Sequence, residues 1–142
     1  DEDGNTEKVT LNSGVTITEA QSLFGQRTGR TYKNAENETI LDDSISYLEN
    51  ANGSKSEYLG SYKNGSDAAD VYSYDGNGNI TSIVHGNERT TYVYDGPNQL
   101  IRVNDSASNT TTIYTYDQGG NIISKIEYNY TSGRLPSNTR NT

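Results

Sequence analysis

Three similar nine-residue segments limit what this chain can fold into more than any other feature of its sequence. They span residues 72–80, 92–100 and 114–122. Each reads Tyr-x-Tyr-Asp-x-x, then Gly or Asn, then Asn or Gln, then Ile or Leu. The aspartates, Asp75, Asp95 and Asp117, follow one another after 20 and then 22 residues. A regular repeat of this length indicates an architecture in which each repeat packs against its neighbours in the sequence.

Weaker copies of the segment precede these three. Residues 1–5 have the Asp-x-x-Gly-Asn half, residues 22–26 have serine in place of aspartate, and Tyr47 is followed by the turn-like residues 50–53. We therefore divide the chain into degenerate repeats over 1–69, three well-marked repeats over 70–130, and a polar tail or linker over 131–142.

The pattern between the turns is that of β-strands. Apolar, aromatic and β-branched residues alternate with polar ones, as in residues 8–11, 15–18 and 91–94, and Asn, Gly, Asp and Ser cluster between them. The sequence predicts an all-β fold of tandem antiparallel β-hairpins that form an open, curved, elongated sheet.

Within one repeat, each part of the motif has a structural reason. Residues two apart in a strand face the same side, so the two tyrosines of a copy present their rings together. The aspartate can accept backbone N–H groups of the turn, and Gly or Asn three residues later tolerates a positive φ. The motif residues are Tyr72, Tyr74, Asp75, Gly78, Tyr92, Tyr94, Asp95, Tyr114, Tyr116, Asp117 and Gly120.

The composition predicts a thin structure. Hydrophobic residues make up 30% of the chain, and it contains 12 tyrosines but no tryptophan or cysteine. Tyrosine can bury its ring while its hydroxyl stays hydrated or bonded, so we expect sheet faces lined by rings and no thick aliphatic core.

The absence of cysteine excludes disulfides and thiolate metal sites. The net charge of -8 disfavours binding to nucleic acids or anionic membranes. No apolar run reaches the roughly 18 residues of a membrane span.

Candidate sites of other kinds find little support. The segment 75–79 imitates the start of an EF-hand loop, but that loop needs Gly and Glu where this chain has Ile80 and Gly86. A phosphate loop needs a following helix, and the β pattern continues instead. His85, the only histidine, lies just beyond an expected strand. The sequence contains no Gly-x-Ser-x-Gly motif whose serine it could activate as a general base. We expect no cofactor, no metal site and no enzymatic activity.

The tandem Tyr-x-Tyr-Asp copies resemble the YD repeat, also called the RHS repeat. This family includes bacterial Rhs proteins, wall-associated proteins of Gram-positive bacteria, insecticidal toxin-complex subunits and animal teneurins. The abundant Asn, Thr and Ser are most similar to the wall-associated bacterial branch. The resemblance implies a β-sheet ribbon that spirals into a hollow shell able to enclose a toxic C-terminal segment. A chain of 142 residues is too short to close such a shell.

Two functions follow as expectations. The first is a non-catalytic structural module of a large secreted or cell-surface protein, with neighbouring YD repeats of the parent chain as partners. The second is a carbohydrate-binding module for cell-wall glycans, in which Tyr72, Tyr92 and Tyr114 stack on sugar rings. Because the sequence begins without methionine, we expect an excised piece. Its free sheet edges would favour self-association.

Overall fold

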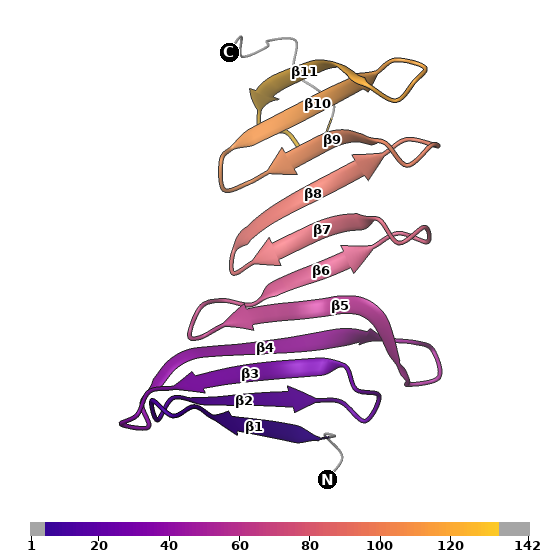
Figure 1. Ribbon diagram of the computed structural model, residues 1–142. Helices are drawn as coiled ribbons and strands as arrows, with labels where there is room; N and C mark the ends of the chain where they lie inside the picture. Colours follow the sequence, from indigo (N-terminus) through magenta and orange to yellow (C-terminus); the bar gives the residue numbers. More distant parts are fainter. Residues whose placement is uncertain (1–4, 134–142) are drawn as a thin grey trace. The chain divides into compact units, whose positions relative to one another are not determined.

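The computed structural model describes residues 5–133, which form eleven β-strands and no helix (Figure 1). The strands are β1 (Thr6–Thr10), β2 (Thr16–Gln21), β3 (Arg27–Lys33), β4 (Thr39–Glu49), β5 (Lys55–Asn64), β6 (Asp70–Tyr74), β7 (Ile80–His85), β8 (Glu88–Tyr94), β9 (Leu100–Asp105), β10 (Thr110–Tyr116) and β11 (Ile122–Asn129). The prediction of an all-β fold is confirmed. Residues 5–133 contain no helix with the length and apolar character that a membrane crossing requires. The weak motif copy over 1–5 falls almost entirely outside the described residues.

The chain divides into two compact units, Asp1–Asp70 and Val71–Thr142. In each unit the strands lie in the order of the sequence and pair antiparallel with their neighbours in the chain (Figure 1). This is the topology of tandem hairpins, as the repeat predicted. The sheet is open, because within the described residues β1 pairs only with β2, and β11 only with β10.

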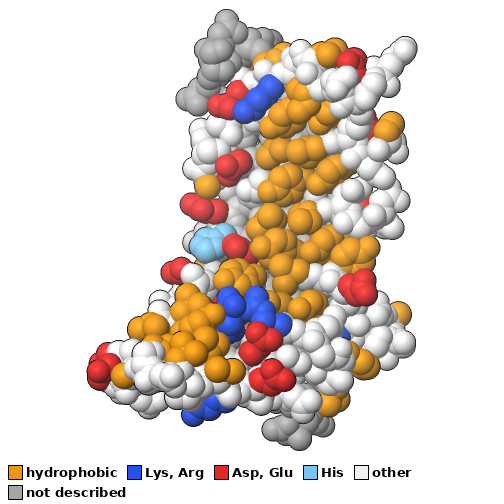
Figure 2. All heavy atoms as spheres, in the orientation of Figure 1, with side chains coloured by type: hydrophobic (Ala, Val, Ile, Leu, Met, Phe, Trp, Pro, Cys, Tyr) orange, Lys and Arg blue, Asp and Glu red, His pale blue; other side chains and the backbone are white. Residues whose placement is uncertain are grey.

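Neither unit has an apolar core. No hydrophobic side chain of the described residues is buried, and apart from Gly60 the buried residues are all polar: Asp43, Ser82, Asn104, Thr111 and Thr112. Figure 2 shows hydrophobic side chains gathered in a band over the strands of the second unit, where they cover one another without a second layer above them. The expectation of a thin structure is confirmed.

The tyrosines of the motif alternate with exposed residues along their strands. Tyr92 and Tyr94 of β8 are half-buried, whereas Val93 between them is exposed. The same alternation occurs at Ser73 of β6 and Thr115 of β10. In β9, Val103 pairs with Tyr92 and Leu100 with Tyr94, so these aliphatic side chains share the face of the rings. The tyrosine face of the second unit is this face, which carries Tyr92, Tyr94, Tyr114 and Tyr116.

One turn geometry recurs seven times along the described residues. In each case the first residue donates its N–H to the carbonyl of the fifth, and the N–H of the fourth returns to the carbonyl of the first. The turns begin at Leu11, Ser22, Asn34, Asn50, Asp75, Asp95 and Asp117. The fourth residue always has a positive φ, from 65° at Asn98 to 85° at Gly78. The degenerate segments 22–26 and 50–53 therefore adopt the turn of the well-marked repeats. The turns beginning at Leu11 and Asn34 share it without carrying the motif.

The fourth turn position should tolerate only glycine and asparagine. We predict that Gly78→Ala lowers the free energy of unfolding by about 1 kcal/mol, since a positive φ costs an L side chain roughly that much. Gly78→Asn should cost clearly less, because Asn98 occupies the equivalent position. Gly76→Ala in the same turn is the matched control, as its φ is not positive and its Cβ would meet open space. Urea unfolding measures all three, and equal effects at positions 76 and 78 would contradict the explanation.

Candidate functional site

The motif aspartates hold the turns of the second unit. Asp75 Oδ1 accepts the backbone N–H groups of Asn77 and Asn79, each at 2.9 Å, and its Oδ2 accepts the Asn79 side-chain amide at 3.0 Å. Asp117 repeats this arrangement with Gly119 and Asn121. These carboxylates are thus occupied by their own turns, and the turns lie along one end of the strands (Figure 1).

Asp95 holds its turn with fewer bonds. It accepts the backbone N–H of Gln99 at 2.8 Å. Pro97 of this turn has no N–H to donate, and a glutamine stands where the other turns have asparagine.

These hydrogen bonds favour the ionised form of two aspartates. The side-chain amide of Asn79, followed by backbone N–H groups, lowers the pKa of Asp75 below its ordinary value of 3.8. The Asn121 amide lowers the pKa of Asp117 in the same way. Folding therefore gains stability from both groups above pH 3.8, and that gain is lost as the pH falls through their lower folded-state pKa values.

A pair of substitutions tests this origin of the lowered pKa. We predict that Asn79→Ala raises the pKa of Asp75 toward its ordinary value and leaves the pKa of Asp117 unchanged. Asn121→Ala should do the reverse, so each variant is the control of the other. Carboxyl ¹³C chemical shifts followed by NMR from pH 2 to 7 provide the measurement. An unchanged Asp75 titration in Asn79→Ala would assign the shift to the backbone bonds instead.

Neighbouring turns are also joined to each other. Asn98 Oδ1 accepts the side-chain amides of Asn77 and Asn79, both at 3.0 Å. Asn98 thus meets two requirements: it takes the positive φ of the fourth turn position, with a value of 65°, and it ties its turn to the preceding repeat. A glycine at this position could meet only the first.

The second tyrosine of a motif forms another link between repeats. Tyr94 Oη donates to the Ile80 carbonyl at 3.0 Å, and Tyr116 Oη donates to the Leu100 carbonyl at 2.7 Å. Ile80 and Leu100 are the final motif residues of the preceding copies. In the first unit, Tyr47 Oη bonds the Arg27 carbonyl at 3.0 Å, and Arg27 follows the degenerate copy 22–26. The link therefore recurs in a degenerate repeat.

The first tyrosine of a motif is placed differently. Tyr92 and Tyr114 are half-buried on the tyrosine face, and their hydroxyls form no hydrogen bond with another described residue. Burial, and secondly the nearby Asp105 carboxylate, raises the pKa of Tyr92. Burial likewise raises the pKa of Tyr94, with smaller effects of Tyr92 and Asp75. Tyr72 and Tyr74 lie half-buried in β6, where each has an interaction of its own.

The residues weighed for ion binding or catalysis do not come together. Within residues 5–133, no group of three or more His, Cys, Asp or Glu side chains is placed to hold a metal ion. His85 is the last residue of β7, not a loop residue beyond it, and it is exposed beside the turn to β8.

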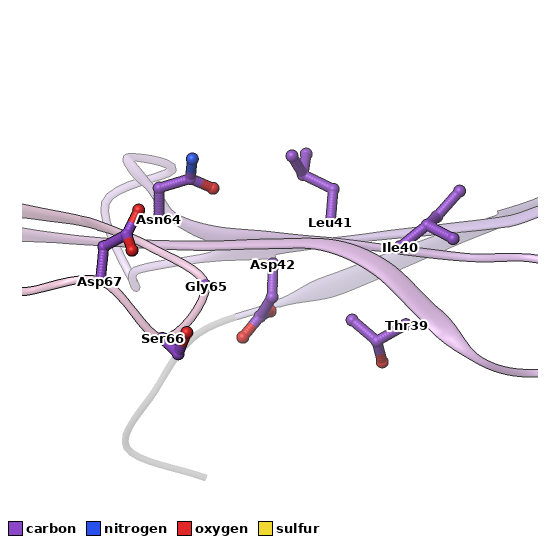
Figure 3. A pocket seen from close by; sticks show the side chains of 8 residues that line it. All are labelled: Thr39, Ile40, Leu41, Asp42, Asn64, Gly65, Ser66 and Asp67. Carbon is purple, nitrogen blue, oxygen red and sulfur yellow. The ribbon is translucent and has the colours of Figure 1, made fainter.

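A hollow of about 350 Å³ in the first unit offers little chemistry (Figure 3). Its walls are Thr39, Ile40, Leu41, Asp42, Asn64, Gly65, Ser66 and Asp67. In Figure 3, Ile40, Leu41 and Asn64 point to one side of the strands, whereas Thr39 and Asp42 point to the other. The polar side chains are therefore divided between the two sides. Asp42 already accepts the Thr31 hydroxyl at 2.7 Å.

The first unit contains a buried charge that the sequence analysis did not single out. The Asp43 side chain is 3% exposed and lies 3.1 Å from Arg27 Nη1 and 3.5 Å from Arg30 Nη2. Arg30 pairs directly with Asp43 across β3 and β4, and its guanidinium lies 5.2 Å from the centre of the Tyr32 ring. A buried carboxylate needs such partners. Arg30 Nε is buried without a hydrogen-bond partner among the described residues. The only sequence signal for the cluster is a pair of arginines three residues apart.

A second unforeseen cluster lies on the face of the second unit opposite the rings. Asn104 and Thr111 are buried there, and Arg102 joins them. No local sequence pattern indicates this cluster, because Arg102 and Asn104 occupy the polar positions of an ordinary strand pattern.

Comparisons with known proteins agree with this fold. No protein-family model matches the chain, and no match is found among curated proteins. Among solved structures, the chain is similar to one described as "Crystal Structure of TcdB2-TccC3-Cdc42", with 19% sequence identity and a TM-score of 0.52. The match covers 86% of this chain and 8% of that chain. The chain thus shares its fold with a small part of a much longer protein.

Proposed function

We propose that the chain is a non-catalytic structural module of a large secreted or cell-surface YD-repeat (RHS) protein. In such a protein the sheet forms part of a shell that can encapsulate a C-terminal toxin or effector. The observation that carries this proposal is the recurring bond from the second tyrosine of one repeat to a carbonyl of the preceding repeat. A bond that recurs with the repeat can be continued indefinitely, which is what a long sheet requires.

The chemistry of the motif supports a structural role. The carboxylate oxygens of Asp75 and Asp117 accept hydrogen bonds from N–H groups of their own turns. The side-chain oxygen of Asn98 accepts hydrogen bonds from two side-chain amides of the neighbouring turn. Groups engaged in this way hold the backbone and are not offered to a substrate.

Repeat duplication tests the proposal. A second copy of residues 75–94 inserted after Tyr94 preserves every Tyr-Asp junction and adds two turns and two strands to the second unit. If repeats interact mainly with their neighbours, the longer chain should unfold with a free energy at least equal to that of the original. The matched control carries Asp→Ala and Tyr→Phe at the copies of Asp75 and Tyr94, and it should be less stable than the plain duplication.

Amide hydrogen exchange shows whether the inserted residues join the sheet. Protection of the inserted strands, comparable to that of β7 and β8, is the expected result. An insert whose amides exchange at the rate of an unfolded peptide would contradict the modular role, as would equal stability of the plain and control insertions.

A second candidate function is binding of cell-wall glycans on the tyrosine face. The observation that favours it is the state of Tyr92 and Tyr114, whose rings are half-buried and whose hydroxyls make no recorded bond within residues 5–133. A ring with a free hydroxyl can stack on a sugar and bond to it.

Titration with soluble cell-wall glycan fragments, followed by NMR, tests this binding. Saturable shifts of Tyr92 and Tyr114 signals are expected, and Tyr92→Ala should weaken the affinity about ten-fold, as for loss of one aromatic contact. Val93→Ala, on the opposite face of the same strand, is the matched control. Shifts that never saturate, or equal effects of the two variants, would rule the glycan function out.

A further inference from the structure

The buried polar cluster on the face opposite the tyrosines has a feature that an ordinary strand does not need. Thr111 is 0% exposed and Asn104 is 7% exposed, although the sheet has no second layer in either unit. Thr111 pairs with Asn104 across β9 and β10, and Asn104 pairs with Thr91 across β8 and β9. Arg102 lies two residues before Asn104 and therefore projects from the same face.

The chain itself covers this cluster. After β11, residues 131–133 return over the sheet, and three of their main-chain atoms are bonded to the cluster. The Thr131 N–H donates to Thr111 Oγ1 at 3.0 Å. The Arg102 guanidinium donates through Nη1 to the Gly133 carbonyl at 3.0 Å and through Nη2 to the Thr131 carbonyl.

The hydrogen bonds beneath the segment fix the orientation of these groups. Asn104 Oδ1 accepts from Arg102 Nε at 2.8 Å and from Thr111 Oγ1 at 3.0 Å, and its amide donates to Thr91 Oγ1 at 2.9 Å. The Thr111 hydroxyl has one proton and two acceptors, Asn104 Oδ1 at 3.0 Å and the Thr131 carbonyl at 3.4 Å. The shorter bond to Asn104 leaves its lone pairs for the Thr131 N–H. Arg102, whose Nε is held by Asn104, presents two further donors in a fixed fork.

We propose that Arg102, Asn104 and Thr111 form a main-chain clamp, a binding site for the backbone of a short peptide segment, which residues 131–133 of the same chain occupy. Its donors and acceptor meet only N–H and C=O groups of the segment, so binding depends on the path of the backbone and not on the side chains bound. The clamp directs residues 131–133 onto the face opposite the tyrosines. This site acts independently of the function proposed above.

Amide exchange at Thr131, measured by NMR on the full chain, tests the clamp. We expect the Thr131 amide to be protected, and Arg102→Gln to accelerate its exchange about ten-fold, as for loss of a hydrogen bond from a charged donor. Arg89→Gln is the matched control, because Arg89 lies on the same face of β8 and has no recorded side-chain contact with the segment among the described residues. The Val103 amide in β9 reports whether the sheet stays folded.

Thr111 provides an independent pair of variants. Thr111→Val keeps the shape of the side chain but removes the acceptor, so it should accelerate Thr131 exchange. Thr111→Ser keeps the hydroxyl and should preserve the protection.

Three results would overturn the proposal. They are exchange of the wild-type Thr131 amide at the rate of an unfolded peptide, equal effects of Arg102→Gln and Arg89→Gln, and no effect of either Arg102→Gln or Thr111→Val. Protection that rises with protein concentration would place the segment of a second copy in the clamp and would likewise overturn the assignment to the same chain.

Discussion

The positive φ at the fourth position of each recurring turn is the constraint on which the rest of the structure depends. Seven hairpins close through this conformation, and each closure sets the register of the two strands that it joins. The register in turn decides that the two tyrosines of a motif fall on one face and that Val93 falls on the other. Only glycine and asparagine fill the fourth position in this chain, because other side chains are strained there.

A sheet without an apolar core must be stabilised by other means. Here the backbone ladder is supplemented by bonds that run from one repeat to the next: Tyr94 to Ile80, Tyr116 to Leu100, and the Asn98 bridge between turns. The side chains that are buried are polar, and the described hydrogen bonds of Asn104 and Thr111 show why this is tolerated, since their polar atoms are paired. Such contacts are local to adjacent repeats, which suits a structure that grows by repetition.

Much of this fold could be predicted from the sequence. The alternation of residues 91–94 and the Asp-x-x-Gly turn at Asp75 identified strands and hairpins correctly, and the repeat predicted that neighbouring hairpins lie side by side. The turns at Leu11 and Asn34 were not recognised as members of the same class, because they share the backbone conformation without the motif. The position of His85 differed by one residue, since strand ends are set by pairing with the next strand and not by the local sequence.

The sequence by itself determined the strands, the turns and the sidedness of the tyrosines. These features depend on properties of residues within a few positions of one another, namely side-chain alternation and the φ preferences of Gly and Asn. Only the tertiary structure decided that Asp43 is buried between Arg27 and Arg30, and that Thr111 receives the N–H of Thr131. These contacts join residues from 13 to 20 positions apart. They exist because several strands are in register at once, and no local pattern records that geometry.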